Sequence, residues 1–124
     1  MNKIDLKVSF KDDRGEITDL IQNEEINAVT LITFTKGSVR ANHIHKQTTQ
    51  WNYVMSGKIR IVTQKEGESK EEQIMNSGDF IVTHPNEGHA LQALEDSEVL
   101  ILTKGPRGGK EYESDTFRLE KPLI

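Results

Sequence analysis

The feature that most constrains the fold is a series of short β-strand patterns separated by turn residues. Residues 4–10 alternate apolar and polar side chains, which is typical of a strand with one buried face. Similar patterns recur at regular spacing, with Gly, Pro, Asn or Asp between them, and no long segment has a helical period. About eight to ten short strands of this kind predict an all-β barrel or sandwich. The expected strands are 4–10, 16–22, 26–35, the segment after Gly37, 50–56, 58–64, 73–75, 79–83, 89–93 and 98–104.

Composition narrows the class of protein. The 124 residues are expected to form one domain, 1–124, and the 34% hydrophobic share suits strands that bury one face. A net charge of -4 provides no basic surface, so neither nucleic acid nor an anionic membrane is expected as a partner. The chain has no cysteine, so any metal must bind nitrogen and oxygen ligands. No secretion signal or long apolar run is present, which predicts a cytoplasmic location.

Polar side chains between Gly37 and Gly57 are placed to converge on one point. His43 and His45 are two residues apart, so on an extended strand both imidazoles lie on the same face. Gln50 follows after a gap long enough to turn into the next strand. The distant His89 is placed to join them, and the set then has the composition of a metal site.

This spacing resembles the first motif of the cupin superfamily, which runs here from residue 37 to residue 57. That motif begins and ends with glycine and contains two histidines separated by one residue, followed by a glutamate. Gln50 takes the place of the glutamate.

The second cupin motif is matched less closely, over residues 78–93. Gly78 and His89 keep their separation, but His84 stands at the proline position, Asn86 at the glycine position and Ala93 at the final asparagine. Asn86 is a mild departure because Asn tolerates positive φ better than most residues.

The resemblance implies a fold and a ligand set. Cupins are double-stranded β-helix barrels of the jelly-roll type, so the fold class expected is an all-β barrel of this kind. The implied metal ligands are His43, His45, Gln50 and His89, which would hold a divalent transition metal such as zinc, nickel, manganese, iron or copper. A neutral amide leaves the charge of the cation uncompensated, so the metal binds less tightly but polarises a bound group more strongly. Some cupins that degrade sugar acids resemble this set.

A narrower resemblance is to the nucleotide-sugar branch of the cupins, the epimerases and ketoisomerases that act on dTDP-sugars. It rests on Asp13-Arg14-Gly15 and on Arg40 followed by His43, His45 and Lys46. It implies that His43 and His45 act as acid and base without a metal, and that Arg14 and Arg40 pair with the diphosphate. The alternative for Arg14 is a local ion pair in a turn.

Three other features leave alternatives open. His84 either lines the mouth of the barrel as a substrate-binding acid or base, or lies in solvent at a strand end. Asn52 either contacts a carbohydrate-type ligand or is a hydrogen-bonded interior residue. Trp51, Tyr53 and Met55 form an apolar stripe on the outer face of their strand, which something must cover. The stripe predicts a homodimer in which the first strand contributes to the sheet of the partner.

Three classes of function follow. The first is an isomerase or epimerase acting on a keto-sugar, with a nucleotide-linked sugar preferred. The second is a metal-dependent cupin enzyme acting on a small free sugar acid or a similar metabolite. The third is a non-catalytic cupin that binds a metal or a ligand. The fold alone does not choose among them, because cupins host many reactions.

Overall fold

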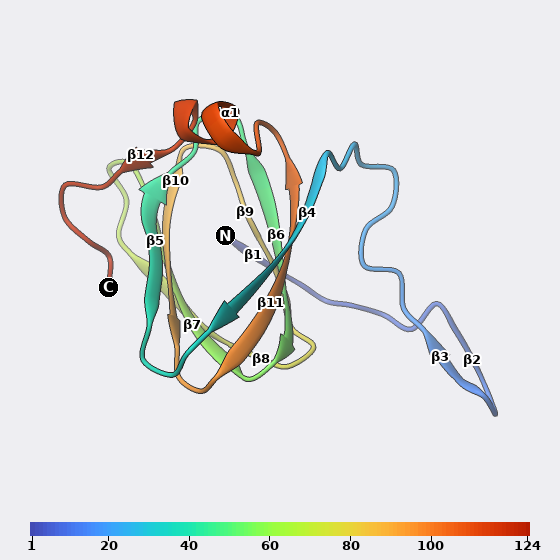
Figure 1. Cartoon of the computed structure of the whole chain (residues 1–124). Helices are drawn as coiled ribbons and strands as arrows, with labels where there is room; N and C mark the ends of the chain where they lie inside the picture. Colours follow the sequence, from blue (N-terminus) through green and yellow to red (C-terminus); the bar gives the residue numbers. More distant parts are fainter.

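A computed structural model describes residues 1–124, and its strands form two antiparallel five-stranded sheets that enclose a barrel-like interior (Figure 1). Sheet 1 has the order β1 (Asn2–Ile4), β9 (Phe80–Thr83), β6 (Thr49–Ser56), β11 (Ser97–Lys104) and β4 (Ala28–Phe34). Sheet 2 has the order β12 (Phe117–Arg118), β5 (Val39–Ile44), β10 (Glu87–Ala93), β7 (Lys58–Lys65) and β8 (Glu71–Asn76). The predicted all-β jelly-roll class is confirmed. The one helix, α1 (Gly109–Ser114), is six residues long, and no helix has the length and apolarity needed to cross a lipid bilayer.

The interior between the sheets is apolar at one end and polar at the other. Alternate residues of each strand point inward, and along β6 these are Val54, Asn52 and Gln50, all buried. The same change from apolar to polar occurs on β7, β9, β10 and β11, where the inner row ends in Thr63, Thr83, His89 and Thr103. The apolar end is one continuous cluster, comprising Met1, Phe34, Val54, Ile59, Ile61, Met75, Ile81, Leu91, Ala93, Val99 and Ile101.

The N-terminal segment covers the outer face of sheet 1. Trp51 and Phe80 are buried there against side chains from residues 4–26, and Tyr53 packs into the same cluster. The stripe predicted to need a cover is therefore covered largely by its own chain, although Met55 stays 48% exposed. β1 pairs with β9 of the same chain, and of the predicted strand 4–10 it includes only Ile4. The contribution of the following residues to the sheet of a partner stays a prediction.

The first two expected strands are wrong in their bounds. Residues 4–10 contain only the end of β1 and the start of β2 (Phe10–Asp12), and the 16–22 strand is reduced to β3 (Gly15–Ile17). β2 and β3 pair with each other in a hairpin that projects away from the barrel (Figure 1). The alternating pattern indicates only that one side of the segment is buried, not that the segment belongs to a sheet. Leu6 is partly buried against sheet 1, but it is not part of a strand. The later expected strands agree with the structure to within about two residues.

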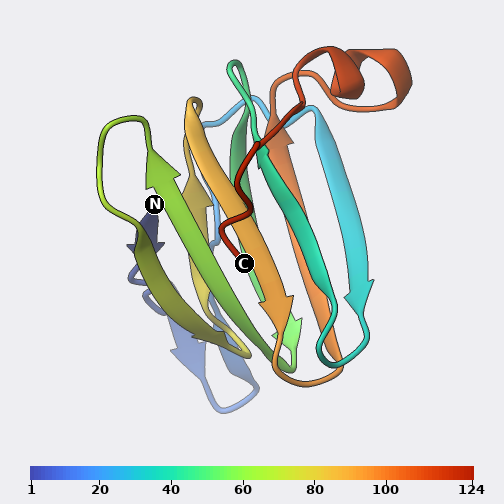
Figure 2. The same ribbon diagram turned by 90° about the vertical axis from the view of Figure 1, so that its left-hand side faces the viewer.

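The C-terminal residues, left unassigned by the sequence, cross the outer face of sheet 2 (Figure 2). Leu119, Leu123 and Ile124 pack there with Val62 and Ala90. The two ends of the chain thus each cover the outer face of one sheet.

We predict that Gly57→Ala destabilises the fold much more than Gly37→Ala. Both glycines have positive φ, 90° and 87°, but a Cβ on Gly57 would lie 2.5 Å from the Asp96 carbonyl oxygen and would also overlap Ser97, whereas one on Gly37 meets nothing within 4 Å. Gly57→Ala should lower the free energy of unfolding by about 2–5 kcal/mol and Gly37→Ala by about 1–2 kcal/mol, measured by urea denaturation. Equal losses would contradict this account.

Candidate functional site

Three histidines come together at the polar end of the interior. His43 is the next-to-last residue of β5, His45 directly follows the strand, and His89 lies opposite His43 on β10. Ring centroids are 4.6 Å apart for His43 and His45, 4.7 Å for His43 and His89, and 5.3 Å for His45 and His89. One ring nitrogen from each lies within 4.8 Å of the others. The convergence predicted from the sequence is present.

An irregularity in β5 places Arg40 on the same face as His43. Arg40 pairs with Leu91 and His43 with His89, and residues paired directly across strands share a face. Leu91 and His89 are two residues apart, but Arg40 and His43 are three apart, so one extra residue must be absorbed between them. Residues 41–42 absorb it, both with positive φ, at 74° and 55°. Both residues line one cavity, while the Arg40 guanidinium lies over the Phe34 ring at 5.4 Å and donates to the Thr33 carbonyl oxygen at 3.4 Å.

Carbonyl groups determine which nitrogen of His45 carries the proton. His45 Nδ1 lies 2.8 Å from the Asp115 carbonyl oxygen, which can only accept, so Nδ1–H donates and Nε2 keeps its lone pair. His89 Nδ1 faces the Glu87 carbonyl oxygen at a longer 3.4 Å. The Nε2 atoms of His45 and His89 are both buried and have no hydrogen-bond partner. Two unpaired nitrogens in one cluster fit the donor set of a metal site.

All three imidazoles are held neutral. Burial lowers the pKa of His43 to about 4, with further lowering by His45, Arg118 and Arg107. Burial, followed by the two neighbouring histidines, lowers the pKa of His89 to about 3. The pKa of His45 is also lowered by burial, although the hydrogen bond to Asp115 opposes the shift. Neutral imidazole is the form that accepts a proton or binds a metal.

The Gln50 amide has a defined orientation. Asn52 Nδ2 donates to the Ile81 carbonyl oxygen at 3.0 Å, so Asn52 Oδ1 is the acceptor for Gln50 Nε2, also at 3.0 Å. Gln50 Oε1 is left without a hydrogen bond and is the atom that Gln50 would offer to a ligand. Asn52, predicted as a substrate-binding residue, is fully buried and orients Gln50.

The segment after β11 closes this end of the barrel and was not predicted. The Tyr112 ring lies 6.4 Å from His43 and 5.6 Å from His45, measured between centroids. The Asp115 carboxylate accepts from Lys46 N at 3.0 Å and from Thr48 Oγ1 at 2.7 Å. The sequence carried no periodic signal for this segment, because a six-residue helix and a two-residue strand are too short to show one.

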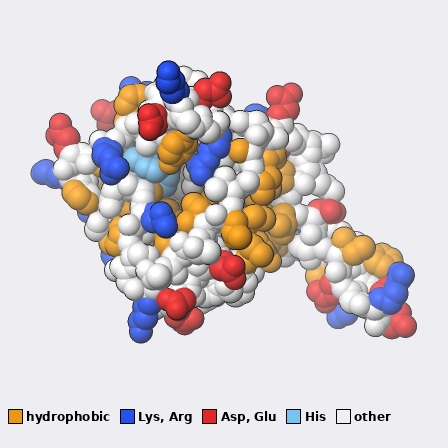
Figure 3. All heavy atoms as spheres, in the orientation of Figure 1, with side chains coloured by type: hydrophobic (Ala, Val, Ile, Leu, Met, Phe, Trp, Pro, Cys, Tyr) orange, Lys and Arg blue, Asp and Glu red, His pale blue; other side chains and the backbone are white.

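A cavity of about 550 Å³ opens beside the cluster. His43 is the only one of the three histidines that lines it, and Figure 3 shows histidine surface exposed in a hollow with Lys and Arg side chains around it. Its walls come from β5 and the C-terminal segment, and comprise Val39, Arg40, Ala41, Asn42, His43, Tyr112, Thr116, Arg118, Leu119 and Pro122.

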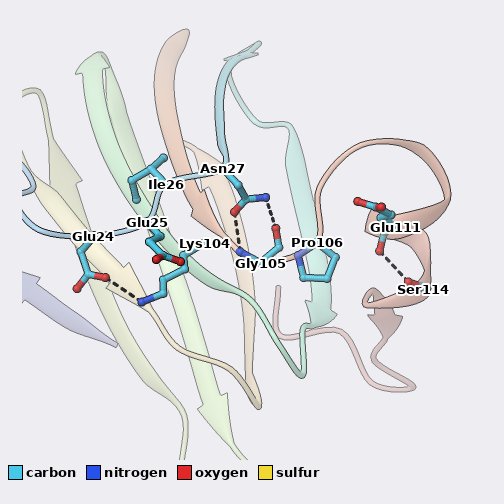
Figure 4. Close-up of a pocket in the computed structure, with 9 residues that line it drawn as sticks. All are labelled: Glu24, Glu25, Ile26, Asn27, Lys104, Gly105, Pro106, Glu111 and Ser114. Carbon is cyan, nitrogen blue, oxygen red and sulfur yellow. Dashed lines mark hydrogen bonds and ion pairs between the residues drawn. The ribbon is translucent and has the colours of Figure 1, made fainter.

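A larger hollow of about 920 Å³ lies elsewhere and contains none of the histidines (Figure 4). Its residues include the ion pair between Lys104 and Glu24, with 3.1 Å between Nζ and Oε2. Asn27 makes two hydrogen bonds with the Gly105 backbone there, donating to the carbonyl oxygen and accepting from N–H. These bonds hold the start of the segment that carries Tyr112, so we assign the hollow a structural role and the site to the cavity beside His43.

Two predicted site residues lie away from the cluster. Arg14 is on the β2–β3 hairpin, where its guanidinium pairs with the Asp12 carboxylate at 2.6 Å. This is the local ion pair in a turn that was the alternative prediction for Arg14. His84 Nε2 bonds Asn2 Oδ1 at 2.6 Å. The structure does not bring either residue to the three histidines within one chain.

Comparison with known proteins identifies the family. The model of the family described as "Cupin" matches residues 18–108. The chain belongs to the cupin family. Among curated proteins it is similar to the pectin degradation protein KdgF of Dickeya dadantii (strain 3937), with 34% identity over 76 residues. That match covers 61% of this chain and only 64% of the length of KdgF.

Two solved structures share the fold of this cupin. One is the TDP-quinovose 3,4-ketoisomerase WlaRB from Campylobacter jejuni, with a TM-score of 0.79, 22% identity, and coverage of 95% of this chain and 92% of the other. The other is a mutant of the 3,4-ketoisomerase QdtA from Thermoanaerobacterium thermosaccharolyticum in complex with TDP-4-keto-6-deoxyglucose, with a TM-score of 0.77, 20% identity, and coverage of 95% and 86%.

We predict that the metal-free protein loses stability as the pH falls from 6.5 toward 4. In that window the unfolded chain protonates its histidines, while folded His43 and His89 stay neutral down to about pH 4 and about pH 3. Each such histidine contributes a slope of up to about 1.4 kcal/mol per pH unit. Urea denaturation of chelator-treated protein across this range measures the slope.

The histidines are tested by substitution. His89→Gln removes one titrating group and should flatten the pH dependence, whatever its effect on stability at pH 7. The matched control is His84→Gln, which removes a histidine outside the cluster. Parallel curves for wild type and His89→Gln would contradict the assignment.

Proposed function

We propose that this cupin is an isomerase or epimerase that moves a proton next to the carbonyl group of a keto-sugar, with nucleotide-linked sugars as its substrate class. The observation that carries the proposal is the cluster of neutral imidazoles at the polar end of the barrel, one of which lines a cavity. A volume of about 550 Å³ is in the range of small-molecule sites. The similarity to a TDP-quinovose ketoisomerase supports the same substrate class.

The chemistry follows from the state of His43. A proton on a carbon beside a carbonyl group is removed by a base whose lone pair is free at neutral pH, and lowering the pKa of His43 to about 4 keeps its lone pair free. As the carbonyl oxygen takes up a proton, this removal gives an enediol; returning a proton to the former carbonyl carbon, while the neighbouring hydroxyl loses its proton and becomes the new carbonyl, gives an isomer. Returning a proton on the opposite face gives an epimer and requires a second proton carrier, for which His45 is the neighbour, 4.6 Å away between ring centroids.

A second candidate is a metal-dependent cupin acting on a free sugar acid. It is favoured by the unpaired Nε2 atoms of His45 and His89, and by the similarity to a pectin degradation protein. In this case His43, His45, Gln50 and His89 would hold a divalent transition metal such as zinc, nickel, manganese, iron or copper. When bound, such a metal supplies a Lewis acid that polarises a carbonyl oxygen. The donor set fits, since each histidine is neutral and the Gln50 oxygen is free of other bonds.

We predict that the protein catalyses exchange of a sugar proton with deuterium when TDP-4-keto-6-deoxyglucose is incubated with it in D₂O. His43→Asn should lower the exchange rate at least about 100-fold, because it removes the base but keeps a side chain of similar size. His84→Asn is the control and should retain the wild-type rate. Proton NMR of the sugar measures the exchange, and thermal unfolding of each variant verifies that it folds.

The same samples separate the two candidates. Absence of exchange, together with absence of TDP binding, would contradict the keto-sugar proposal. The metal-dependent candidate then gains support if zinc or nickel, at a hundredfold excess over the dissociation constant, stabilises the wild type by about 2.7 kcal/mol and leaves His45→Ala unchanged.

We also propose that the protein is a homodimer. The stripe of Trp51, Tyr53 and Met55 is largely covered within the chain, so the proposed interface lies on other exposed apolar residues. Val29 and Leu31 on the outer face of β4 are 61% and 54% exposed. On the projecting hairpin, Phe10 and Ile17 are 52% and 58% exposed. Figure 3 shows apolar side chains on both the barrel and the projecting part. Apolar patches of this kind mark contacts with another protein surface, and a second copy offers a complementary one.

We predict that Leu31→Lys converts the dimer to a monomer, because the dimer would then bury an unpaired charge. Ile74→Lys is the matched control, since Ile74 is a 42% exposed aliphatic residue on the edge strand β8. Light scattering at tens of micromolar measures the mass. A monomeric wild type, or an Ile74→Lys variant that dissociates while Leu31→Lys does not, would contradict this interface.

A further inference from the structure

We propose that Arg107 and Arg118, both in the segment that follows the barrel, form a recognition site for an anionic group of the ligand beside the histidine cluster. The inference rests on the proposed function in one respect, that the ligand reacts at the histidines. Its own claim concerns binding, and it holds for any ligand that carries a carboxylate or a phosphate. Neither arginine was singled out by the sequence patterns.

Strand pairing places Arg118 next to His43. β12 pairs with β5, and Arg118 lies directly opposite His43, so the two side chains share a face of sheet 2. Both residues line the cavity of about 550 Å³. The neighbouring residue Phe117 points the other way, where its ring packs under the Lys46 ammonium at 4.3 Å. Arg118 is therefore directed toward the reacting end of the barrel.

Stacking places Arg107 against Tyr112, which lines the same cavity. Its guanidinium carbon lies 4.6 Å from the centroid of the Tyr112 ring. Tyr112 in turn packs edge-on near His43, at 6.4 Å between centroids.

The arginines near the cavity lack the carboxylate partners that the other arginines have. Arg14 pairs with Asp12 at 2.6 Å and Arg60 pairs with Glu72 at 2.5 Å. The three arginines near the cavity form no ion pair. They are Arg40, Arg107 and Arg118.

A shortage of acidic residues does not explain this difference. The chain has 20 acidic and 16 basic residues, excluding histidine, and a net charge of -4. Figure 3 shows Lys and Arg side chains around the exposed histidine surface, in a molecule that is acidic overall. Arg118 lines the cavity and Arg107 stacks on Tyr112, which also lines it. Guanidinium groups there without a carboxylate partner produce a local positive potential that attracts an anion.

The site is built into the fold before a ligand arrives. The Asp115 carboxylate accepts hydrogen bonds from the loop after β5, and its carbonyl oxygen bonds His45 Nδ1 at 2.8 Å. Leu119 N donates to the Asn42 carbonyl oxygen at 3.0 Å. These bonds flank Arg118 on both sides and tie its segment to the strand that carries His43. They fix the backbone position of Arg118, whose exposed guanidinium is free to match carboxylate and phosphate oxygens in a bidentate geometry.

The test is calorimetric titration with two probes, TDP and D-galacturonate, which carry a diphosphate and a carboxylate respectively. Arg107→Gln and Arg118→Gln should each weaken binding of the probe that the wild type prefers by about tenfold or more, because each loses charge-assisted hydrogen bonds. Arg60→Gln is the control, because Arg60 is a half-buried arginine on β7 that pairs with Glu72, outside the cavity, and the variant should bind as the wild type does. The probe that binds tells which oxyanion the site takes.

Three outcomes overturn the proposal. In the first, the wild type binds neither probe at 10 mM. In the second, Arg107→Gln and Arg118→Gln keep the affinity of the wild type. In the third, the control Arg60→Gln loses as much affinity as they do. Failure of the proposed chemistry is distinguishable, because His43→Asn should lower proton exchange at least about 100-fold while still binding the preferred probe. Arg118→Lys keeps the charge without the planar fork, so partial recovery of affinity is expected if the contact is bidentate.

Discussion

The pairing of β5 with β10 is the constraint on which the site depends. It sets His43 directly opposite His89, and the bulge at residues 41–42 lets Arg40 share their face. A slip of one residue would turn every side chain of β5 to the opposite face. The register is held by the apolar end of the barrel, where Leu91 of β10 packs in the central cluster. The apolar half of the interior thus determines the geometry of the polar half.

Asp115 connects the scaffold to the chemistry. Its carboxylate holds the loop that follows β5, and its carbonyl oxygen determines which nitrogen of His45 carries the proton. One residue therefore orients a histidine and also fixes the segment that carries Tyr112 and Arg118. Because a single anchor serves both purposes, the histidine cluster and the cationic wall of the cavity keep a constant relation to each other.

Sequence patterns predicted those parts of the site that lie on regular strands. His43 and His45 are two residues apart, and this spacing alone placed them on one face. His89 was expected to join them because its motif resembles that of the cupins, and its place opposite His43 bears this out. For Arg14 the resemblance implied pairing with a diphosphate and the alternative was a local ion pair in a turn; its hairpin projects from the barrel and the arginine pairs with Asp12. A short motif says which residue types are present, and the direction of the hairpin depends on packing that the motif does not contain.

The sequence by itself determined the strand periods, the turns and the identity of the three histidines, because these depend on side-chain alternation and on local backbone preference. Only the tertiary structure decided what covers the outer faces and what closes the site. Leu6 and Trp51 are far apart in the chain but pack together, and Arg118 becomes a neighbour of His43 only when β12 adds to the edge of β5. Contacts between such distant residues leave no periodic trace in the sequence. They form only when the strands pack against one another in the folded chain.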